Sequence, residues 1–367
     1  MLARVLIAGL LLACVACAPS TPLTVPSDAG TTAPPTEQTL TAFDAARISS
    51  AASDPNFQEL SADLDLSSGP YSSATLVVDL ATTCVPFSSW ANDPPPEGQN
   101  WPADCDAFDR NFEISLDGAE PGGADAGAAA TPGLELVRAI TPFGGPLHLE
   151  RDLTSIANGL PGTHRIRARI NTFSDPAGLV TGSAAGWNVS AKLVLTPGPA
   201  PLHPLAVIPL FFGDLTSADP VMSSFTVPSG TSKGFFEYRT TGHGQAAGDL
   251  TSCSGPAEEF CRRQHTISLD GQTLKTFTPW KTCTALCTLA KTEGDAGVDY
   301  CVENPCGAVA SVKASRANWC PGSESAPIVI DAPELANAGD HQVSWQVSQI
   351  AAGGSVRVSL IYYAFGD

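Results

Sequence analysis

The chain has few charged residues, and cations are the rarer kind. Asp, Glu, Lys and Arg make up 15% of the 367 residues, with 19 Lys and Arg against 37 Asp and Glu. Binding to a phosphate backbone requires clustered cations, and the sequence contains no Lys/Arg cluster. The composition therefore excludes nucleic acid as a partner.

Histidine is also scarce. The six histidines are scattered, and neither they nor the cysteines show the paired spacing of a zinc or copper site. A histidine-ligated metal centre is therefore not expected, and no cofactor is predicted.

Long apolar runs are nearly absent, with one exception at the start of the chain. Arg4 precedes the run 5–16, which is too short to span a bilayer and is typical of a secretory signal within 1–17. The run ends in Leu-Leu-Ala-Cys-Val-Ala-Cys, which resembles a bacterial lipobox. Either Cys14 or Cys17 is the expected lipidation site, and simple secretion with cleavage after Ala is the alternative. We expect an exported outer-membrane or cell-surface lipoprotein that contacts membrane only through this anchor.

Residues 18–40 are mainly Pro, Thr, Ser and Ala, a composition that predicts a disordered tether. Beyond the lipobox the chain has nine further cysteines. In an exported protein most of them should form disulfides, although their odd number leaves one over unless Cys17 joins them.

Glycine (33) and proline (31) are abundant, which favours a turn-rich, all-β fold of the sandwich or jelly-roll type. Only 44–52 indicates a short helix. The Pro-rich segment 197–204 predicts a linker between an N-terminal domain, 41–196, and a C-terminal domain, 205–367. Alternation of apolar and polar residues predicts strands at 74–80, 111–116, 165–170, 187–195, 206–212, 225–227, 234–240, 265–269, 328–331, 342–347 and 355–364.

The pentapeptide Ile-Ser-Leu-Asp-Gly occurs at 114–118 and again at 267–271. Each copy follows an acidic, cysteine-bearing cluster, 105–110 in the first half and 258–263 in the second. A Thr-Pro-aromatic tripeptide follows each copy. Three features in the same order predict two related modules.

Both clusters combine carboxylates and arginines beside a cysteine. In the first, Asp109 and Arg110 lie next to Cys105, which closes a loop if it pairs with Cys84. In the second, Glu259 lies next to Cys261. Such groups suit acid–base chemistry, whereas solvated surface ion pairs are the alternative interpretation.

These clusters resemble those of the peptide-N-glycosidase F family of bacterial amidases. The similar stretches are Cys-Asp-Ala-Phe-Asp-Arg at 105–110, Ile-Thr-Pro-Phe at 140–143, Glu-Phe-Cys at 259–261 with His-Thr-Ile at 265–267, and Arg-Ala-Asn-Trp-Cys-Pro-Gly at 316–322. The resemblance extends from about Phe43 to the C-terminus. It implies two side-by-side, eight-stranded antiparallel jelly rolls with the active site at their interface.

The resemblance also implies a function and its residues. The family hydrolyses the amide between an Asn side chain and the first N-acetylglucosamine of an N-linked glycan, giving Asp and a glycosylamine. Asp109 then corresponds to the principal catalytic residue and Glu259 to a second carboxylate, with Arg110 and Arg316 supporting them. The expected partners are N-glycoproteins or glycopeptides, and the expected enzyme is metal-independent and monomeric. Further substrate-binding or supporting positions are Asn171, Phe173, His243 and Trp319.

Three departures accompany the resemblance. Asn171 replaces a family glutamate, and Gly242-His243-Gly244 replaces a tryptophan-bearing turn. The disulfide beside Glu259 is spaced differently, with Cys253 as the partner expected for Cys261. Cys283 with Cys320 is the further pair that the resemblance implies, while the pairing of Cys287, Cys301 and Cys306 stays open. Asn171 favours the alternative function, a non-catalytic glycan- or protein-binding surface lipoprotein on the same scaffold.

Overall fold

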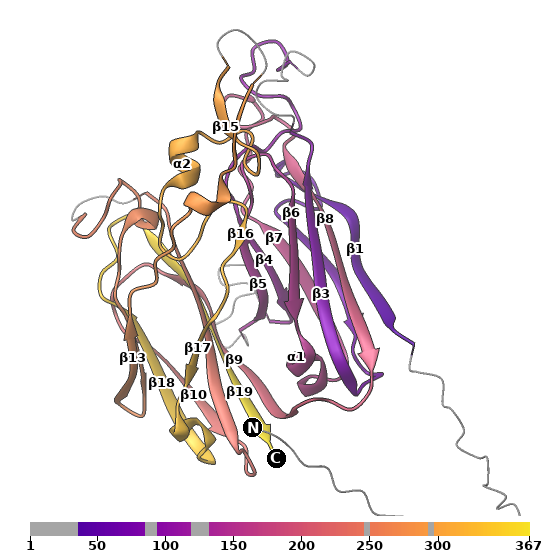
Figure 1. Ribbon diagram of the computed structural model, residues 1–367, viewed down its shortest axis with the longest axis vertical. Helices are drawn as coiled ribbons and strands as arrows, with labels where there is room; N and C mark the ends of the chain where they lie inside the picture. The colour runs from indigo at the N-terminus through magenta and orange to yellow at the C-terminus, as the bar shows by residue number, and fades with distance from the viewer. Residues whose placement is uncertain (1–35, 85–93, 119–131, 246–249, 293–296) are drawn as a thin grey trace, which may run out of the picture. The chain divides into compact units, whose positions relative to one another are not determined.

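The computed structural model describes residues 36–84, 94–118, 132–245, 250–292 and 297–367. The fold is all-β, as predicted. In the N-terminal half, one antiparallel sheet has the strand order β1-β8-β3-β6 and the facing sheet the order β2-β7-β4-β5 (Figure 1). The described connections between these strands contain little helix, and α1 (Thr154–Gly159) lies between β6 and β7. The strands are β1 (Gln38–Ser49), β2 (Glu59–Asp65), β3 (Tyr71–Thr82), β4 (Asn111–Leu116), β5 (Leu134–Ile140), β6 (Leu147–Asp152), β7 (Thr163–Ile170) and β8 (Gly186–Pro197).

The C-terminal half repeats this strand order. Its sheets are β9-β19-β11-β17 and β10-β18-β12-β13, which correspond strand for strand to the N-terminal pair. The predicted duplication therefore extends to the connectivity. Additional short elements are β14 (Leu289–Lys291), β15 (Asp299–Cys301), β16 (Ser323–Glu324) and α2 (Val309–Lys313). The main strands are β9 (His203–Leu215), β10 (Val221–Val227), β11 (Lys233–His243), β12 (His265–Leu269), β13 (Gln272–Phe277), β17 (Ile328–Asp331), β18 (Gly339–Val347) and β19 (Ser355–Gly366).

Strand β19 joins the hydrophobic cores of both halves. Successive side chains of a strand point to opposite faces of its sheet. Val358, Leu360 and Tyr362 pack in the C-terminal core, whereas Ile361 and Tyr363 pack in the N-terminal core. Both faces of this sheet are therefore covered, which explains why nearly all of β19 is buried.

Toward the start of β19, the face that meets the N-terminal half becomes polar. Arg357 binds Glu113 of β4 through two hydrogen bonds of 2.9 and 2.8 Å. Deeper in the interface, Arg138 of β5 binds Glu135 at 2.7 and 2.9 Å and the carbonyl of Arg357 at 2.7 Å. Ser359 donates to the same Glu135 carboxylate. The interface thus changes from an apolar contact into a buried ionic network that leads to an open cavity.

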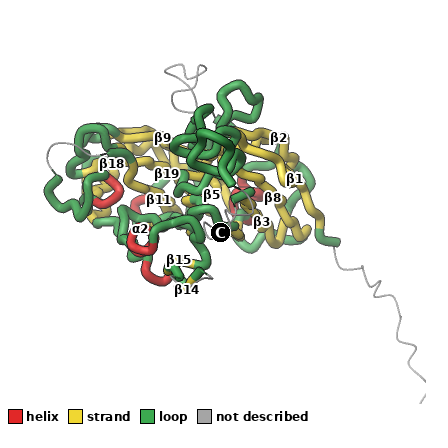
Figure 2. Tube along the Cα trace, turned by 90° about the horizontal axis from the view of Figure 1, so that it is seen from above, coloured by secondary structure: helices red, strands yellow, loops and turns green. Residues whose placement is uncertain are grey.

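The two halves also share a β-sheet. Strand β16 of the C-terminal half pairs with β5, with Ser323 opposite Ile140 and Glu324 opposite Ala139. Figures 1 and 2 show β5 between the strands of the two halves. This pairing covers an edge that the N-terminal sheet would otherwise expose.

The helix expected at 44–52 is wrong, because residues up to Ser49 belong to strand β1. The strand pairs with β8 through two register shifts, and Ala45 has a φ of 45°. These irregularities break the alternation by which a strand is recognised. At the predicted linker, β8 ends at Pro197 and β9 begins at His203. Residues 1–35, with most of the predicted tether, lie outside the described residues.

The repeated pentapeptide forms the same side-chain clamp in each half. Asp117 and Asp270 both have a φ of 49°. Asp117 accepts from His164 Nδ1 at 2.6 Å, and Asp270 pairs with His341 Nδ1 at 2.7 Å. The other ring nitrogen of each histidine lies 2.8 Å from a backbone carbonyl, of Leu160 or Asn337. The repeat therefore fastens two strands in each module and carries no reactive group.

The second clamp predicts a pH-dependent contribution to stability. Burial lowers the pKa of His341, but its bonds to Asp270 and to the Asn337 carbonyl outweigh burial and raise the pKa above 6.5. The stabilisation is therefore complete below the unfolded-state pKa and is lost as pH rises through the folded-state pKa. We expect His341→Gln to lower the free energy of unfolding by about 1 kcal/mol near pH 5 and by less near pH 9.

Urea denaturation of wild type and variant at both pH values measures this difference. The exposed His203, replaced in the same way, provides the control. A destabilisation by His341→Gln that is equal at both pH values would contradict the clamp.

Candidate active site

Three separate segments bring the predicted catalytic side chains together, and a disulfide holds each segment. Asp109 follows Cys105, which is bonded to Cys84. Glu259 lies in a single 3-10 turn, Glu258–Phe260, closed by the bond from Cys253 to Cys261. Arg316 precedes Cys320, which is bonded to Cys283. Cross-links beside all three segments restrict the movement of the groups they carry.

Arg316 lies between the two carboxylates. Its Nη2 is 3.6 Å from Asp109 Oδ2, and its Nε is 3.5 Å from Glu259 Oε1. The side chain of Arg316 is only 1% exposed, whereas those of Asp109 and Glu259 are 20% and 22% exposed. A buried cation thus holds two carboxylates that still reach solvent, one from each half of the chain.

The backbone and aromatic rings fix the guanidinium in this position. Arg316 Nη1 donates to the carbonyls of Ser311 and Ala314 at 2.8 and 2.9 Å. The guanidinium carbon lies 4.6 Å from the ring centre of Trp319 and 5.2 Å from that of Phe260. With its hydrogen bonds and both flanking rings in place, Arg316 is preorganised to stabilise negative charge.

This environment shifts the pKa of both carboxyl groups. Burial, together with the negative charge of Glu259, raises the pKa of Asp109 to about 7, against the opposing effect of Arg316. Burial also raises the pKa of Glu259, and Arg316 partly offsets this shift. At neutral pH Asp109 is therefore poised to accept or donate a proton, which is the property of a general acid–base group.

Asp109 and Glu259 line a cavity of about 330 Å³. Its wall is mostly charged or polar, and both halves contribute. Alongside the two carboxylates, it is formed by Arg110, Asn111, Glu113, Arg169, Asn171, Asp214, His243, Gly244, Ser355 and Arg357. A hydroxyl-rich ligand such as a sugar suits a cavity with so many donors and acceptors.

The other predicted residues have different positions. Arg110 lines the cavity, but its Nε binds Asp106 at 3.1 Å instead of Asp109. Asn171 also lines it. Phe173 is 48% exposed and does not belong to the cavity wall. Trp319 is buried behind Arg316, where it donates to the Gly242 carbonyl at 2.8 Å.

His243 lies in the cavity wall as a neutral imidazole. Burial, followed by the positive charge of Arg138, lowers the pKa of His243 to about 3. Its Nε2 lies 2.7 Å from the Thr241 hydroxyl, and its ring stacks on Trp319 with the centres 5.8 Å apart. A neutral ring can hydrogen-bond a ligand without adding charge to the site.

Sequence reasoning missed Glu113 and Arg357, which form the ionic floor of the cavity. Burial would raise the pKa of Glu113, but the charge and hydrogen bonds of Arg357 outweigh it and hold the pKa at about 2. Glu113 is therefore a permanent anion. Each of the two residues is the lone charge in its strand, a signal that could have drawn attention to them.

The charge run at 258–263 divides into three roles. Glu258 is buried and binds Arg263 at 2.6 Å and the amide of Ala351 at 3.0 Å, so it supports the turn. Its neighbour Glu259 faces the cavity. Arg262 lies 4.7 Å from the ring centre of Trp280, in a different pocket. Only Glu259 of these charges belongs to the candidate active site.

The cysteines outside the candidate active site include a further disulfide pair and the two of the predicted anchor. Cys287 is bonded to Cys301, which gives four disulfides in the described part of the chain, and Cys306 lies close to Gly144. Cys14 and Cys17 lie outside the described residues. The disulfides indicate an oxidising compartment outside the cytoplasm.

None of the described helices is long and apolar enough to cross a membrane. Within the described residues, no three His, Cys, Asp or Glu side chains are grouped as ligands for a metal ion. The metal-independent reaction stays a prediction.

The fold is shared with solved structures of other proteins. The structure of PNGF-II has a TM-score of 0.64 and 18% identity, over 90% of this chain and 65% of that one. PNGase F, described as a glycosylasparaginase from Flavobacterium meningosepticum, has a TM-score of 0.63 and 16% identity, over 90% and 96%. A structure of peptide-N(4)-(N-acetyl-beta-D-glucosaminyl) asparagine amidase has a TM-score of 0.63 and 15% identity, over the same shares.

At the sequence level, residues 212–364 match the family described as peptide-N-glycosidase F, C terminal. This match confirms, for the C-terminal half, the resemblance to that family seen in the sequence. The chain spans about two thirds of the length of PNGF-II (65%). No curated protein sequence matches the chain significantly.

Proposed function

We propose that this protein is a glycoamidase that hydrolyses the amide bond between an Asn side chain and the first N-acetylglucosamine of an N-linked glycan. The observation that carries the proposal is the arrangement of Asp109, Arg316 and Glu259 at the polar cavity, with the pKa of Asp109 raised to about 7. N-glycoproteins or glycopeptides are the proposed substrates.

The reaction consumes one water. Asp109, as a carboxylate, takes a proton from the water while the oxygen attacks the amide carbon. The carbon–nitrogen bond then breaks, and Asp109 returns the proton to the departing nitrogen. The products are an Asp side chain and a glycosylamine, so the proton balance closes within the site.

Glu259 and Arg316 have supporting roles in this scheme. Glu259 accepts a hydrogen bond from the water and orients it toward the amide carbon. Arg316 carries a fixed positive charge beside both carboxylates, where it stabilises the negative charge that develops on the amide oxygen. Asn111 is also part of the cavity wall, where its amide can hydrogen-bond a sugar.

A second candidate function is a glycan-binding protein without turnover. It is favoured by Asn171, which lines the cavity where the family has a glutamate. An amide side chain can hydrogen-bond a sugar but cannot take up a proton.

Mass spectrometry of an N-glycopeptide incubated with the protein distinguishes these functions. The reaction is run in water enriched in heavy oxygen. Glycan loss with conversion of Asn to Asp, carrying one heavy oxygen atom, establishes the amidase. An intact glycopeptide that still binds would overturn the amidase and support the second candidate.

The site also predicts the pH dependence of the reaction. Because Asp109 acts as a base, kcat/KM should rise with pH through about 7, where its carboxyl group loses its proton. Glu259→Gln removes a negative charge that raises the pKa of Asp109. The midpoint of the pH profile, measured on the activity that this variant keeps, should therefore move to lower pH. Arg316→Gln removes a positive charge that lowers the same pKa, so the midpoint of its pH profile should move to higher pH. Identical midpoints in all three proteins would contradict the coupling.

We also propose that the folded part is held at the outer membrane or cell surface by lipid on Cys14 or Cys17. The signal-like run and the tether-like composition of residues 18–40 support this placement. Mass spectrometry of the N-terminal peptide tests this proposal. The absence of lipid on both Cys14 and Cys17 would contradict the anchor.

A further inference from the structure

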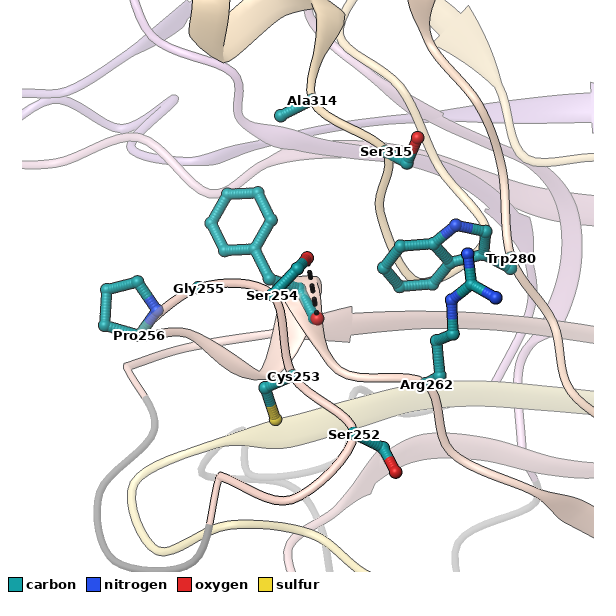
Figure 3. A pocket seen from close by; sticks show the side chains of 10 residues that line it. Ser252, Cys253, Ser254, Gly255, Pro256, Arg262, Trp280, Ala314 and Ser315 are labelled. Atoms are coloured by element: carbon teal, nitrogen blue, oxygen red, sulfur yellow. Dashed lines mark hydrogen bonds between the residues drawn. The ribbon is translucent and has the colours of Figure 1, made fainter.

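A second and larger cavity adjoins the candidate active site. This cavity, called here the aromatic pocket, has a volume of about 650 Å³. Figure 3 shows the indole of Trp280 and the guanidinium of Arg262 together on one side, with Gly255 and Pro256 across from them and Ser315 nearby. None of these residues has a role in the proposed chemistry.

The aromatic pocket and the active-site cavity share a wall. Glu259 lines the active-site cavity, and the next residue, Phe260, lines the aromatic pocket. Likewise, Ser315 lines the pocket immediately before Arg316, whose guanidinium lies 5.2 Å from the ring centre of Phe260. The two spaces are thus separated by the side chains of Phe260 and Arg316.

The two cavities differ in chemistry. Seven of the twelve residues around the active-site cavity are Asp, Glu or Arg. Arg262 is the one charged residue among the ten that line the aromatic pocket, where it accompanies two aromatic rings, a proline and three serines. The first composition suits a sugar, and the second suits a polypeptide. Apolar side chains pack on aromatic rings, and backbone carbonyls accept from guanidinium and hydroxyl groups.

The proposed substrate has the same asymmetry, because its scissile amide joins a glycan to a polypeptide. We propose that the aromatic pocket binds the polypeptide on one side of the glycosylated Asn, in an extended conformation, with an apolar side chain against Phe260 and Trp280. This inference rests on the proposed glycoamidase function. Extended residues advance by about 3.3–3.6 Å each, and adjacent residues of the protein, Glu259 and Phe260, line the two spaces, so a short segment beside the Asn can enter the pocket.

Binding of two glycopeptides with the same glycan tests the pocket. One ligand is a single glycosylated Asn with blocked ends, and the other is a glycosylated Asn flanked on both sides by three residues that include Leu and Phe. Calorimetry is done with Asp109→Asn protein, in which turnover should be about a thousandfold slower. We expect the longer ligand to bind about tenfold more tightly, as for one well-buried apolar side chain.

Two variants of the pocket and one control are made in that background. Trp280→Ala and Arg262→Ala should each remove most of the tenfold gain and leave affinity for the single Asn unchanged. Because Arg262 is exposed, its replacement should not disturb folding, and Arg262→Ala therefore tests the pocket even if Trp280→Ala does not fold. Met222→Ala, at an exposed apolar residue of β10 outside both cavities, should keep the gain.

The outcomes separate the pocket from the reaction. Equal affinity for both ligands, or a gain that survives both pocket variants, would overturn the pocket even if wild-type protein releases the glycan. A gain that both variants remove supports the pocket. If wild-type protein nevertheless releases no glycan from either ligand, the glycoamidase function fails while the polypeptide site remains.

Discussion

Replacement of Asp109 by Asn should reduce kcat/KM for an N-glycopeptide by about a thousandfold, within the usual range for loss of a general acid–base group. Asn keeps the size of the side chain and one acceptor oxygen but cannot exchange a proton. Because the carboxyl group is largely buried beside Glu259, removing its charge should not destabilise the fold. The thermal unfolding midpoint should therefore be retained or rise.

A change in the same loop provides the control. Asp104→Asn alters a carboxylate that does not line the cavity, and its activity should match that of the wild type. Glycan release is measured for both variants with one glycopeptide. Activity of Asp109→Asn above a tenth of the wild-type value would show that another group performs the proton transfer.

Replacement of Arg138 by Met should lower the free energy of unfolding by about 3–5 kcal/mol, the usual cost of removing one partner from a buried ion pair. Arg138 is fully buried and binds Glu135 through two hydrogen bonds. Without it, the Glu135 carboxylate would stay in the interface with Ser359 as its one hydrogen-bonding side chain among the described residues. Urea denaturation measures the difference.

Two further variants test this explanation. Arg165→Met removes an exposed pair with Asp63 and should cost less than about 1 kcal/mol. Adding Glu135→Leu to Arg138→Met removes the orphaned carboxylate and should recover much of the loss. If Arg138→Met costs no more than Arg165→Met, the interface does not depend on this ion pair.

The sequence predicted the fold class and the duplication because both leave local signals. Alternating apolar residues marked most strands, and the repeated pentapeptide marked the same corner of two modules. The helix expected at 44–52 was wrong because β1 contains register shifts and a positive φ at Ala45, which disturb the alternation. Such irregularities depend on the neighbouring strand, which a local pattern does not contain.

For the site, family-like motifs selected the three residues that the structure brings together, Asp109, Glu259 and Arg316. Their roles stay proposals. The motifs did not reveal that Arg110 pairs with Asp106, or that Glu113 and Arg357 form the cavity floor. The first contact is local, but several side chains nearby could have paired with Arg110. The contact between Glu113 and Arg357 joins positions far apart in the chain, one in each half. Only tertiary packing decides whether a lone charge in a strand meets solvent or a buried partner.

The shared sheet constrains the order of events during biosynthesis. The β5 edge of the N-terminal sandwich is covered by Ser323 and Glu324, so this edge stays open until synthesis has passed Glu324. The apolar face of β19 that completes the N-terminal core is made later still. A nascent N-terminal sandwich therefore exposes an unpaired strand edge and an uncovered apolar face, and both favour association with other chains until the C-terminal half has been made.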